Sequence, residues 1–204
     1  MKKLFLILLS TLLFVTYANC QTISISPTGV GPVKLGMNIA DVPKSVKGLY
    51  DHIKVETTPE YYDEMEYETI PAYDTYYFML GDEKMFHTVP SESGVITYLN
   101  VVSKKLSYKG VHPQMSCRDV LKAKAKLMSS GAYASCEFSC YFRFEDPSIT
   151  IWFPTNNEGA FTQRGEDKLL NANEYSLREL KFDAADFKDA TKVETISIQQ
   201  AWLL

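Results

Sequence analysis

The sequence predicts an α+β fold made of two tandem units, each a helix packed on an antiparallel β-sheet. The first observation is a repeated hexapeptide: MNIADV at 37–42 returns as MSCRDV at 115–120, 78 positions later. The second is that strand-like runs of apolar and aromatic residues follow both copies. A chain of 204 residues, of which 46% are hydrophobic, can bury the core that two such units require. The predicted boundaries are 21–103 for the first unit and 104–204 for the second.

Each hexapeptide has the residue order of a helix start. In the first copy, Asn38 can cap the helix by accepting a hydrogen bond from an amide of the first turn. Asp41 suits the positive end of the helix dipole and can reach back to the cap. Met37 and Val42 occupy the two positions of a hydrophobic staple. The second copy has Met115, Ser116, Asp119 and Val120 in the same four positions.

The segments after the hexapeptides predict the helices themselves. Residues 42–53 have apolar side chains at helical spacing, although Pro43 and Gly48 weaken the pattern. Residues 120–131 show a stronger helical pattern that ends at Gly131. Each unit therefore receives one helix.

Strands are expected after each helix. The first unit has a hairpin at 74–89, turning near Gly81 and Asp82, and a further strand at 94–102. The second has a hairpin at 140–154, around Asp146 and Pro147, and a closing strand at 193–200. Residues 103–110 would link the units, and the polar segment 156–174 receives no role.

The segment GPVKLGMNIADV at 31–42 resembles the helix-start motif of the outer-membrane assembly lipoprotein BamE. The duplicated unit is similar to that of the β-lactamase inhibitory protein. In the second unit, Gln114 stands at the position where the helix-start motif has glycine. The resemblance covers one short segment in each unit and implies a fold of exported binding and scaffolding proteins, with no particular target. The matching residues are Gly36, Met37, Asn38 and Val42 in the first unit, and Met115, Ser116, Asp119 and Val120 in the second.

The first 20 residues predict a secretory signal peptide. Lys2 and Lys3 precede an apolar run from Leu4 to Val15, and small residues follow up to Cys20. The run is too short to span a bilayer with its flanks, and no later stretch has the length of a membrane helix. Two outcomes are open at Cys20: acylation, as in a bacterial lipoprotein, or cleavage after it. Both predict an exported protein that is periplasmic, tethered to the outer membrane or secreted.

Charge and motifs argue against several classes of function. Loss of Lys2 and Lys3 with the signal peptide would change the formal net charge from −4 to −6, and an acidic surface does not suit nucleic acid. His52, His87 and His112 lie in no metalloprotease or nucleophile-elbow pattern, and no phosphate-binding glycine loop occurs. We therefore expect no enzymatic activity, no cofactor and no metal, although a catalytic site built from distant residues would leave no such motif.

Three cysteines follow the signal peptide, and in an exported protein their disulfides would persist. Cys136 and Cys140 are too close in sequence for a bridge along one strand, since four residues span about 13 Å. A helix over 117–129 and a returning strand would bring Cys140 level with Cys117. The sequence therefore favours a Cys117–Cys140 disulfide. The alternatives are a reactive Cys117 thiol at a helix start and a metal site.

The segment 55–77 combines acidic residues with tyrosines. One interpretation is a strand edge, where charges prevent aggregation while alternate tyrosines pack on the core. The other is a recognition surface, since tyrosine provides contact area at a low entropic cost. The residues predicted to contact a partner are Tyr61, Tyr62, Tyr67 and Tyr73.

Together these features favour an exported, non-catalytic binding or scaffolding protein of the bacterial cell envelope that contacts a protein partner. The alternative is a proteinaceous inhibitor or accessory subunit of an extracellular hydrolase, and a small hydrolase or sugar-binding enzyme is the third candidate. Contact with a membrane is expected only through a lipid on Cys20.

Overall fold

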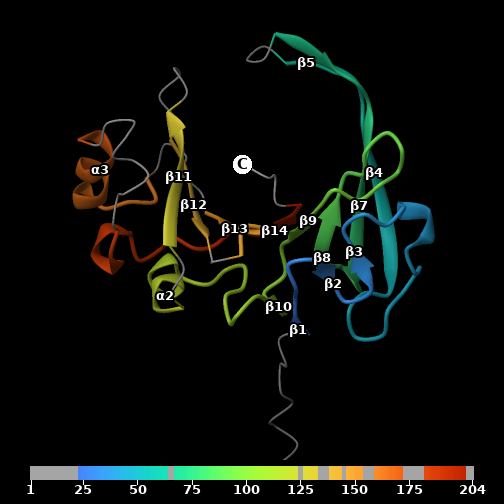
Figure 1. Ribbon diagram of the computed structural model, residues 1–204, viewed down its shortest axis with the longest axis horizontal. Helices are drawn as coiled ribbons and strands as arrows, with labels where there is room; N and C mark the ends of the chain where they lie inside the picture. Colours follow the sequence, from blue (N-terminus) through green and yellow to red (C-terminus); the bar gives the residue numbers. More distant parts are fainter. Residues whose placement is uncertain are drawn as a thin grey trace, which may run out of the picture.

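The computed structural model describes residues 23–63, 67–123, 126–132, 138–143, 146–153, 159–171 and 182–200. Its central element is an antiparallel sheet of eight strands, which runs from β11 on the left to β4 on the right of Figure 1. The order of strands is β11-β12-β13-β14-β9-β8-β7-β4. Their bounds are β4 (His52–Thr58), β7 (Tyr73–Leu80), β8 (Glu83–Thr88), β9 (Tyr98–Val101), β11 (Lys126–Ala132), β12 (Phe138–Arg143), β13 (Ile149–Trp152) and β14 (Thr195–Gln199).

Short sheets and helices complete the described fold. β1 (Ile23–Ser24) pairs in parallel with β10 (Leu106–Ser107). β2 (Gly29–Val30) pairs antiparallel with β3 (Val33–Lys34), and β5 (Tyr61–Asp63) with β6 (Glu68–Ile70). The helices are the 3-10 turns η1 (Ile39–Asp41) and η3 (Ala184–Asp186) and the α-helices α2 (Cys117–Lys122) and α3 (Gln163–Leu170). Among the described helices, none combines the length and the apolar character of a membrane span.

The predicted fold class, two tandem units with a helix packed on each sheet, is wrong. Strands from both expected units, 21–103 and 104–204, belong to one sheet, and the described α-helices have only six and eight residues. Most of the expected helix at 42–53 is a series of turns between η1 and β4. Pro43 lacks the amide that a continuing helix needs, and Gly48 has a φ of +80°, outside the helical region.

The second expected helix, at 120–131, is wrong over most of its length. α2 ends at Lys122, and β11 begins at Lys126. β11 is paired with β12, with Lys126 opposite Arg143. Pairing in the sheet overrides the helical pattern here, since a helix in place of β11 would leave the edge of β12 unpaired.

The expected strands are confirmed. Residues 74–89 form the β7–β8 hairpin, which turns at Gly81 with a φ of +59°. β12 and β13 overlap the hairpin expected at 140–154, with β12 beginning at Phe138. β9 lies within 94–102 and β14 within 193–200. In β9, buried and partly exposed side chains alternate, as expected for a strand with one face on the core. Leu99 and Val101 are fully buried, and their neighbours are partly exposed.

The sheet has an internal two-fold arrangement. Each half of the chain contributes four successive sheet strands from the outside inwards, β4-β7-β8-β9 and β11-β12-β13-β14. The two last strands, β9 and β14, pair with each other, with Asn100 opposite Ser197. Leu99 lies opposite Ile198 and Val101 opposite Ile196, at equal distances along the strands from that central pair. Ile96 and Val193 each donate to the carbonyl of a hexapeptide methionine and precede Asn100 and Ser197 by four residues. Asn100 and Ser197 are therefore equivalent, and the axis that relates the halves of the sheet passes between them.

The repeated hexapeptides occupy equivalent places in the two halves. Each pairs with the chain that leads into the last strand of its half, Asn38 with Val95 before β9 and Ser116 with Lys192 before β14. Both methionines are partly buried against the core. Matching backbone bonds join Ile96 N to Met37 O at 2.9 Å and Val193 N to Met115 O at 2.8 Å. The two copies of the hexapeptide thus make equivalent backbone pairings, and they lead into the short elements η1 and α2.

The core lies on one face of the sheet. A row of directly opposite residues crosses six adjacent strands, and each of its side chains is fully buried. Each buried side chain of this kind contributes roughly 1.5–3 kcal/mol to folding. The same cluster includes residues of β2, β3 and α2, so the beginnings of both halves contribute to the core on this face. From β12 to β7 the row is Phe142, Ile151, Ile196, Val101, Phe86 and Phe78.

Candidate protein-interaction surface

A two-stranded arm continues the β4–β7 hairpin beyond the sheet, and its described residues are 59–63 and 67–72. Figure 1 shows its strand β5 standing past the ends of β4 and β7. The register is the same on both sides of the junction, since Thr58 pairs with Tyr73 in the sheet and Tyr61 with Ile70 in the arm. The arm is therefore the outer part of one long ribbon.

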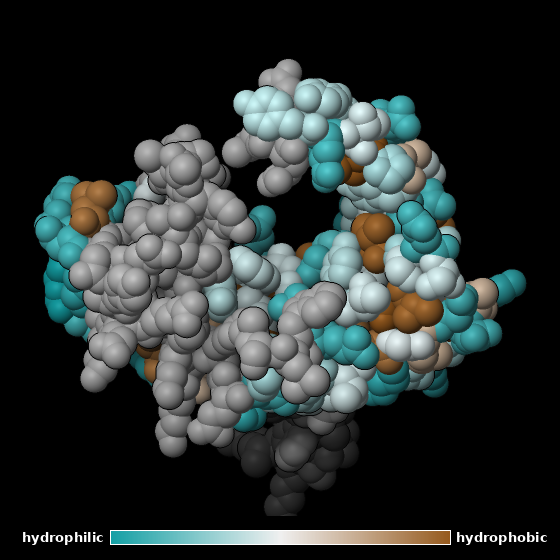
Figure 2. Space-filling view, turned by 45° about the horizontal axis from the view of Figure 1, so that its top comes forward, coloured by the Kyte–Doolittle hydropathy of each residue, from teal (hydrophilic) through white to brown (hydrophobic). Residues whose placement is uncertain are grey.

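Two prolines separate the arm from the sheet. Continuing the common register places Pro59 opposite Ala72 and Pro71 opposite Glu60. Proline has no amide hydrogen. Because hydrogen-bonded and non-hydrogen-bonded pairs alternate in an antiparallel ladder, one of these two neighbouring prolines removes a ladder bond. The interruption coincides with the break between the eight-stranded sheet and the β5–β6 pair. In Figure 2 the arm stands clear of the body beyond this point.

Three of the four tyrosines predicted to contact a partner lie on the arm. Tyr61 is 43% exposed, Tyr62 58% and Tyr67 81%. Tyr67 has a φ of +55° next to the start of β6, a left-handed conformation that suits a tight turn. The fourth, Tyr73, is the first residue of β7 and is only partly exposed. The structure thus gathers Tyr61, Tyr62 and Tyr67 at the arm and places Tyr73 at its base.

The charge of the arm has one sign. Residues 59–72 contain five acidic residues and no lysine or arginine. In the antiparallel pair, directly opposite residues share a face, so Tyr61, Ile70, Asp63 and Glu68 lie on one face and Tyr62 with Thr69 on the other. Each face of the ribbon therefore presents a tyrosine, and this arrangement is suited to contact with a protein surface.

The cysteines differ from the predicted pattern. Cys117 is buried at the start of α2 and is a free thiol, so the predicted Cys117–Cys140 bridge is not formed. The expected geometry fails because α2 has six residues and Cys140 lies in β12, opposite Ser129. Burial raises the pKa of the Cys117 thiol to about 12, which is contrary to the alternative of a reactive thiolate. Cys20 and Cys136 lie outside the described residues.

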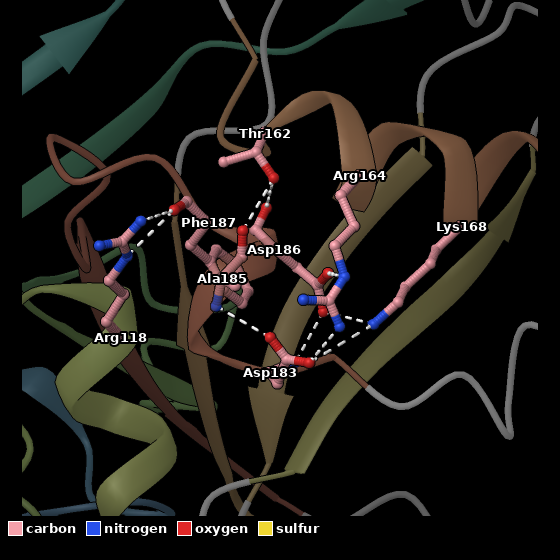
Figure 3. A network of polar contacts seen from close by, with 8 residues as sticks. All are labelled: Arg118, Thr162, Arg164, Lys168, Asp183, Ala185, Asp186 and Phe187. Carbon is pink, nitrogen blue, oxygen red and sulfur yellow. Dashed lines mark hydrogen bonds and ion pairs between the residues drawn. The ribbon is translucent and has the colours of Figure 1, made fainter.

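A buried ionic cluster, which the sequence did not reveal, lies in the second half. The fully buried carboxylate of Asp186 accepts a hydrogen bond from Lys168 Nζ at 2.5 Å and pairs with Arg164 Nε at 3.2 Å. It also accepts a bond from the amide of Asp183 at 2.6 Å, as part of a capping box around η3. Figure 3 shows both cations of α3 reaching Asp183 and Asp186. The cluster holds α3, from the unassigned segment 156–174, against η3 and is structural.

A second polar chain crosses the two-fold axis on the face opposite the core. Trp152 Nε1 donates to Ser197 Oγ at 3.0 Å, and Ser197 Oγ donates to Asn100 Oδ1 at 2.6 Å. The Asn100 amide lies 3.4 Å from His87 Nε2. Burial and then Lys84 lower the pKa of His87. Because Asn100 separates Ser197 from His87, this chain does not place a nucleophile beside a base.

The described residues contain no group of three or more His, Cys, Asp or Glu that could hold a metal ion. His52 lies beside Asp51, at 2.5 Å, and His112 beside the carbonyl of Pro113, at 2.7 Å. The three histidines therefore lie in separate surroundings within the described part of the chain. The arm is the strongest candidate surface.

Comparisons with known proteins add little to this geometry. No family model matches the chain, and no curated protein matches it. Among solved structures, an uncharacterized protein, YfeY from Escherichia coli, is similar with a TM-score of 0.47 and 15% sequence identity. The similarity covers 87% of this chain and 99% of that one. At this level it supports no conclusion about function, and it has no bearing on the resemblance to BamE.

Proposed function

We propose that this chain is a non-catalytic binding or scaffolding protein of the bacterial cell envelope that contacts a protein partner through the arm. The observation that carries the proposal is the exposure of Tyr61, Tyr62 and Tyr67 on a ribbon that leaves the body of the protein. Much of the apolar area of these rings is available to a second molecule. The pattern of the first 20 residues supports export.

The chemistry of the arm indicates the kind of surface it fits. Tyrosine has few rotatable bonds, so its ring can be fixed in an interface at a low entropic cost, and its hydroxyl can still form a hydrogen bond. The acidic residues around the tyrosines would speed the approach of a positively charged protein. The partner is therefore expected to present apolar pockets within a basic surface.

The test begins with photo-crosslinking in cells that produce the protein. A photoreactive residue at position 62 should trap one recurring protein, whereas the same residue at position 170, on α3, should not. Leu170 is a suitable control because its side chain is 75% exposed and lies outside the arm. The trapped protein is then purified, and its affinity for the chain is measured by calorimetry.

Replacing Tyr61, Tyr62 and Tyr67 together with alanine should weaken binding by at least about 30-fold, as expected for the loss of one or more hot-spot residues. Leu170→Ala should leave the affinity unchanged. Thermal unfolding of both variants should resemble that of the wild type, because the altered side chains contribute little to the core. Unchanged affinity in the triple variant would refute the proposal.

A further inference from the structure

The strand β4 lies at one edge of the eight-stranded sheet and has a partner on one side only. Its seven residues, His52–Thr58, pair with β7 along their whole length. Within the described part of the chain, no backbone hydrogen bond joins β4 to any other segment. The amides and carbonyls on its outer side can therefore accept another strand.

We propose that the outer edge of β4 pairs with β4 of a second copy of this chain, antiparallel, about a two-fold axis at Val55. In this register Lys54 lies opposite Glu56 of the second copy, and Val55 lies opposite its own counterpart. Ile53 lies opposite Thr57. The inference does not depend on the proposed function of the arm.

The charges of β4 support this register. Lys54 and Glu56 are on the same face of the strand, with side chains 55% and 41% exposed, and they pair with each other at 2.7 Å. Two such strands about the axis would place each lysine next to two carboxylates. A parallel copy in register would instead place like charges side by side, which is unfavourable. The edge is thus self-complementary in one direction only.

The opposite face of β4 provides an apolar contact. The side chain of Val55 lies on this face and is 47% exposed. Valine is among the residues that favour β-strands, so Val55 is suited to packing against a neighbouring strand. Its exposure on an edge strand would fall when a second valine lies across the axis. A pair of seven-residue strands forms a small interface, so a dimer that dissociates in the micromolar range is expected.

Sedimentation equilibrium of the full chain provides the first test. The wild type should show a monomer–dimer equilibrium. Lys54→Glu and Glu56→Lys each create two like-charge contacts and should weaken the dimer by about 10-fold. The double variant Lys54→Glu/Glu56→Lys restores opposite charges across the axis and should return the dissociation constant to within about 3-fold of the wild type. A wild type that is monomeric at all concentrations, or a double variant no better than the single ones, would overturn the proposal.

Cysteine crosslinking tests the register itself. Val55→Cys should form a disulfide between two copies under mild oxidation, with peptide mapping showing a position 55 to position 55 link. Leu170→Cys is the control and should form none. The absence of the position 55 link would contradict the register. The triple tyrosine variant of the arm should dimerise like the wild type, and a loss of dimer in that variant would instead show that the arm is the dimer contact.

Discussion

The two repeated helix starts use the same backbone pairing to begin different local structures. Both methionine carbonyls accept a bond from the chain that precedes the last strand of their half. The first start continues as the 3-10 turn η1, and the second as the α-helix α2. Asn38 caps its turn by accepting a bond from Ala40 N at 3.0 Å, whereas Ser116 makes no side-chain cap. Pairing with the neighbouring chain therefore positions each start, and the side-chain cap is secondary.

The predicted caps consequently have different outcomes. The cap at Asn38 is confirmed. Ser116 is confirmed as the residue at the N-cap position of α2, but the side-chain bond expected there is not made. The first amide of α2, that of Cys117, donates to Thr191 O at 3.0 Å, so it is already paired with backbone. The equivalent amide in the first half, that of Ile39, donates to Gly94 O at 2.8 Å. The need for a serine cap is therefore smaller than the sequence suggests.

The largest expected difference between the halves concerns Asp186. Asp186→Ala removes a fully buried carboxylate with its bonds to Lys168 and to the amide of Asp183. We expect a loss of about 2–4 kcal/mol in the free energy of unfolding, measured by urea denaturation. Asp189→Ala is the control, because Asp189 pairs with Arg118 but its side chain is 86% exposed. Equal losses in the two variants would show that the buried cluster is not a stabilising feature of the second half.

A smaller effect compares the valines at the end of each hexapeptide. Val42 is 7% exposed and Val120 is fully buried. Val42→Ala and Val120→Ala should each lower the free energy of unfolding by roughly 1–3 kcal/mol. Val55→Ala, at the exposed edge strand, should cost much less. A loss at only one of the two hexapeptides would mean that the halves are not energetically equivalent.

The caps should differ by about 1 kcal/mol. Asn38→Ala removes the bond to Ala40 N and a 3.1 Å bond from the side-chain amide to Ser93 O, so it should cost about 1 kcal/mol. Ser116→Ala removes no cap bond and should be nearly neutral. Denaturation midpoints of the two variants measure the difference. A larger cost for Ser116→Ala would reverse our comparison of the two starts.

The smallest effect concerns His87 of β8, whose ring lies beside the Asn100 amide of β9. Because burial and Lys84 lower the pKa of His87, the folded state prefers the neutral ring. This contribution to stability is complete above the unfolded-state pKa of about 6.5 and decreases as the pH falls through the lower folded-state value. His87→Gln should remove a pH-dependent loss of less than about 1 kcal/mol between pH 7 and 5.5. An unchanged profile in urea denaturation would contradict this assignment.

The strands were predictable, whereas much of the remaining structure was not. β9 has alternating burial that is visible in the sequence, and the β7–β8 hairpin has strand-forming residues on both sides of a turn at Gly81. The helix expected at 42–53 fails at Pro43 and Gly48, both visible in advance. The helix expected at 120–131 fails because β11 pairs with β12, a contact that no local pattern encodes.

The candidate interaction surface was also predictable only in part. The composition of residues 55–77 identified the tyrosines, and two of them, Tyr61 and Tyr62, lie in β5. The separation of the arm from the sheet follows from Pro59 and Pro71 only once the register is known. The Asp186 cluster joins residues about 20 positions apart in sequence and depends on the packing of α3 against η3.

Deletion of the arm is the decisive test of the proposed contact with a protein partner. Thr58 and Tyr73 are directly opposite, so residues 59–72 can be replaced by Asn-Gly, which closes the β4–β7 hairpin with a two-residue turn. We expect the shortened chain to unfold like the wild type but no longer to bind the protein crosslinked at position 62. A shortened chain that folds and binds this protein with undiminished affinity would contradict the account.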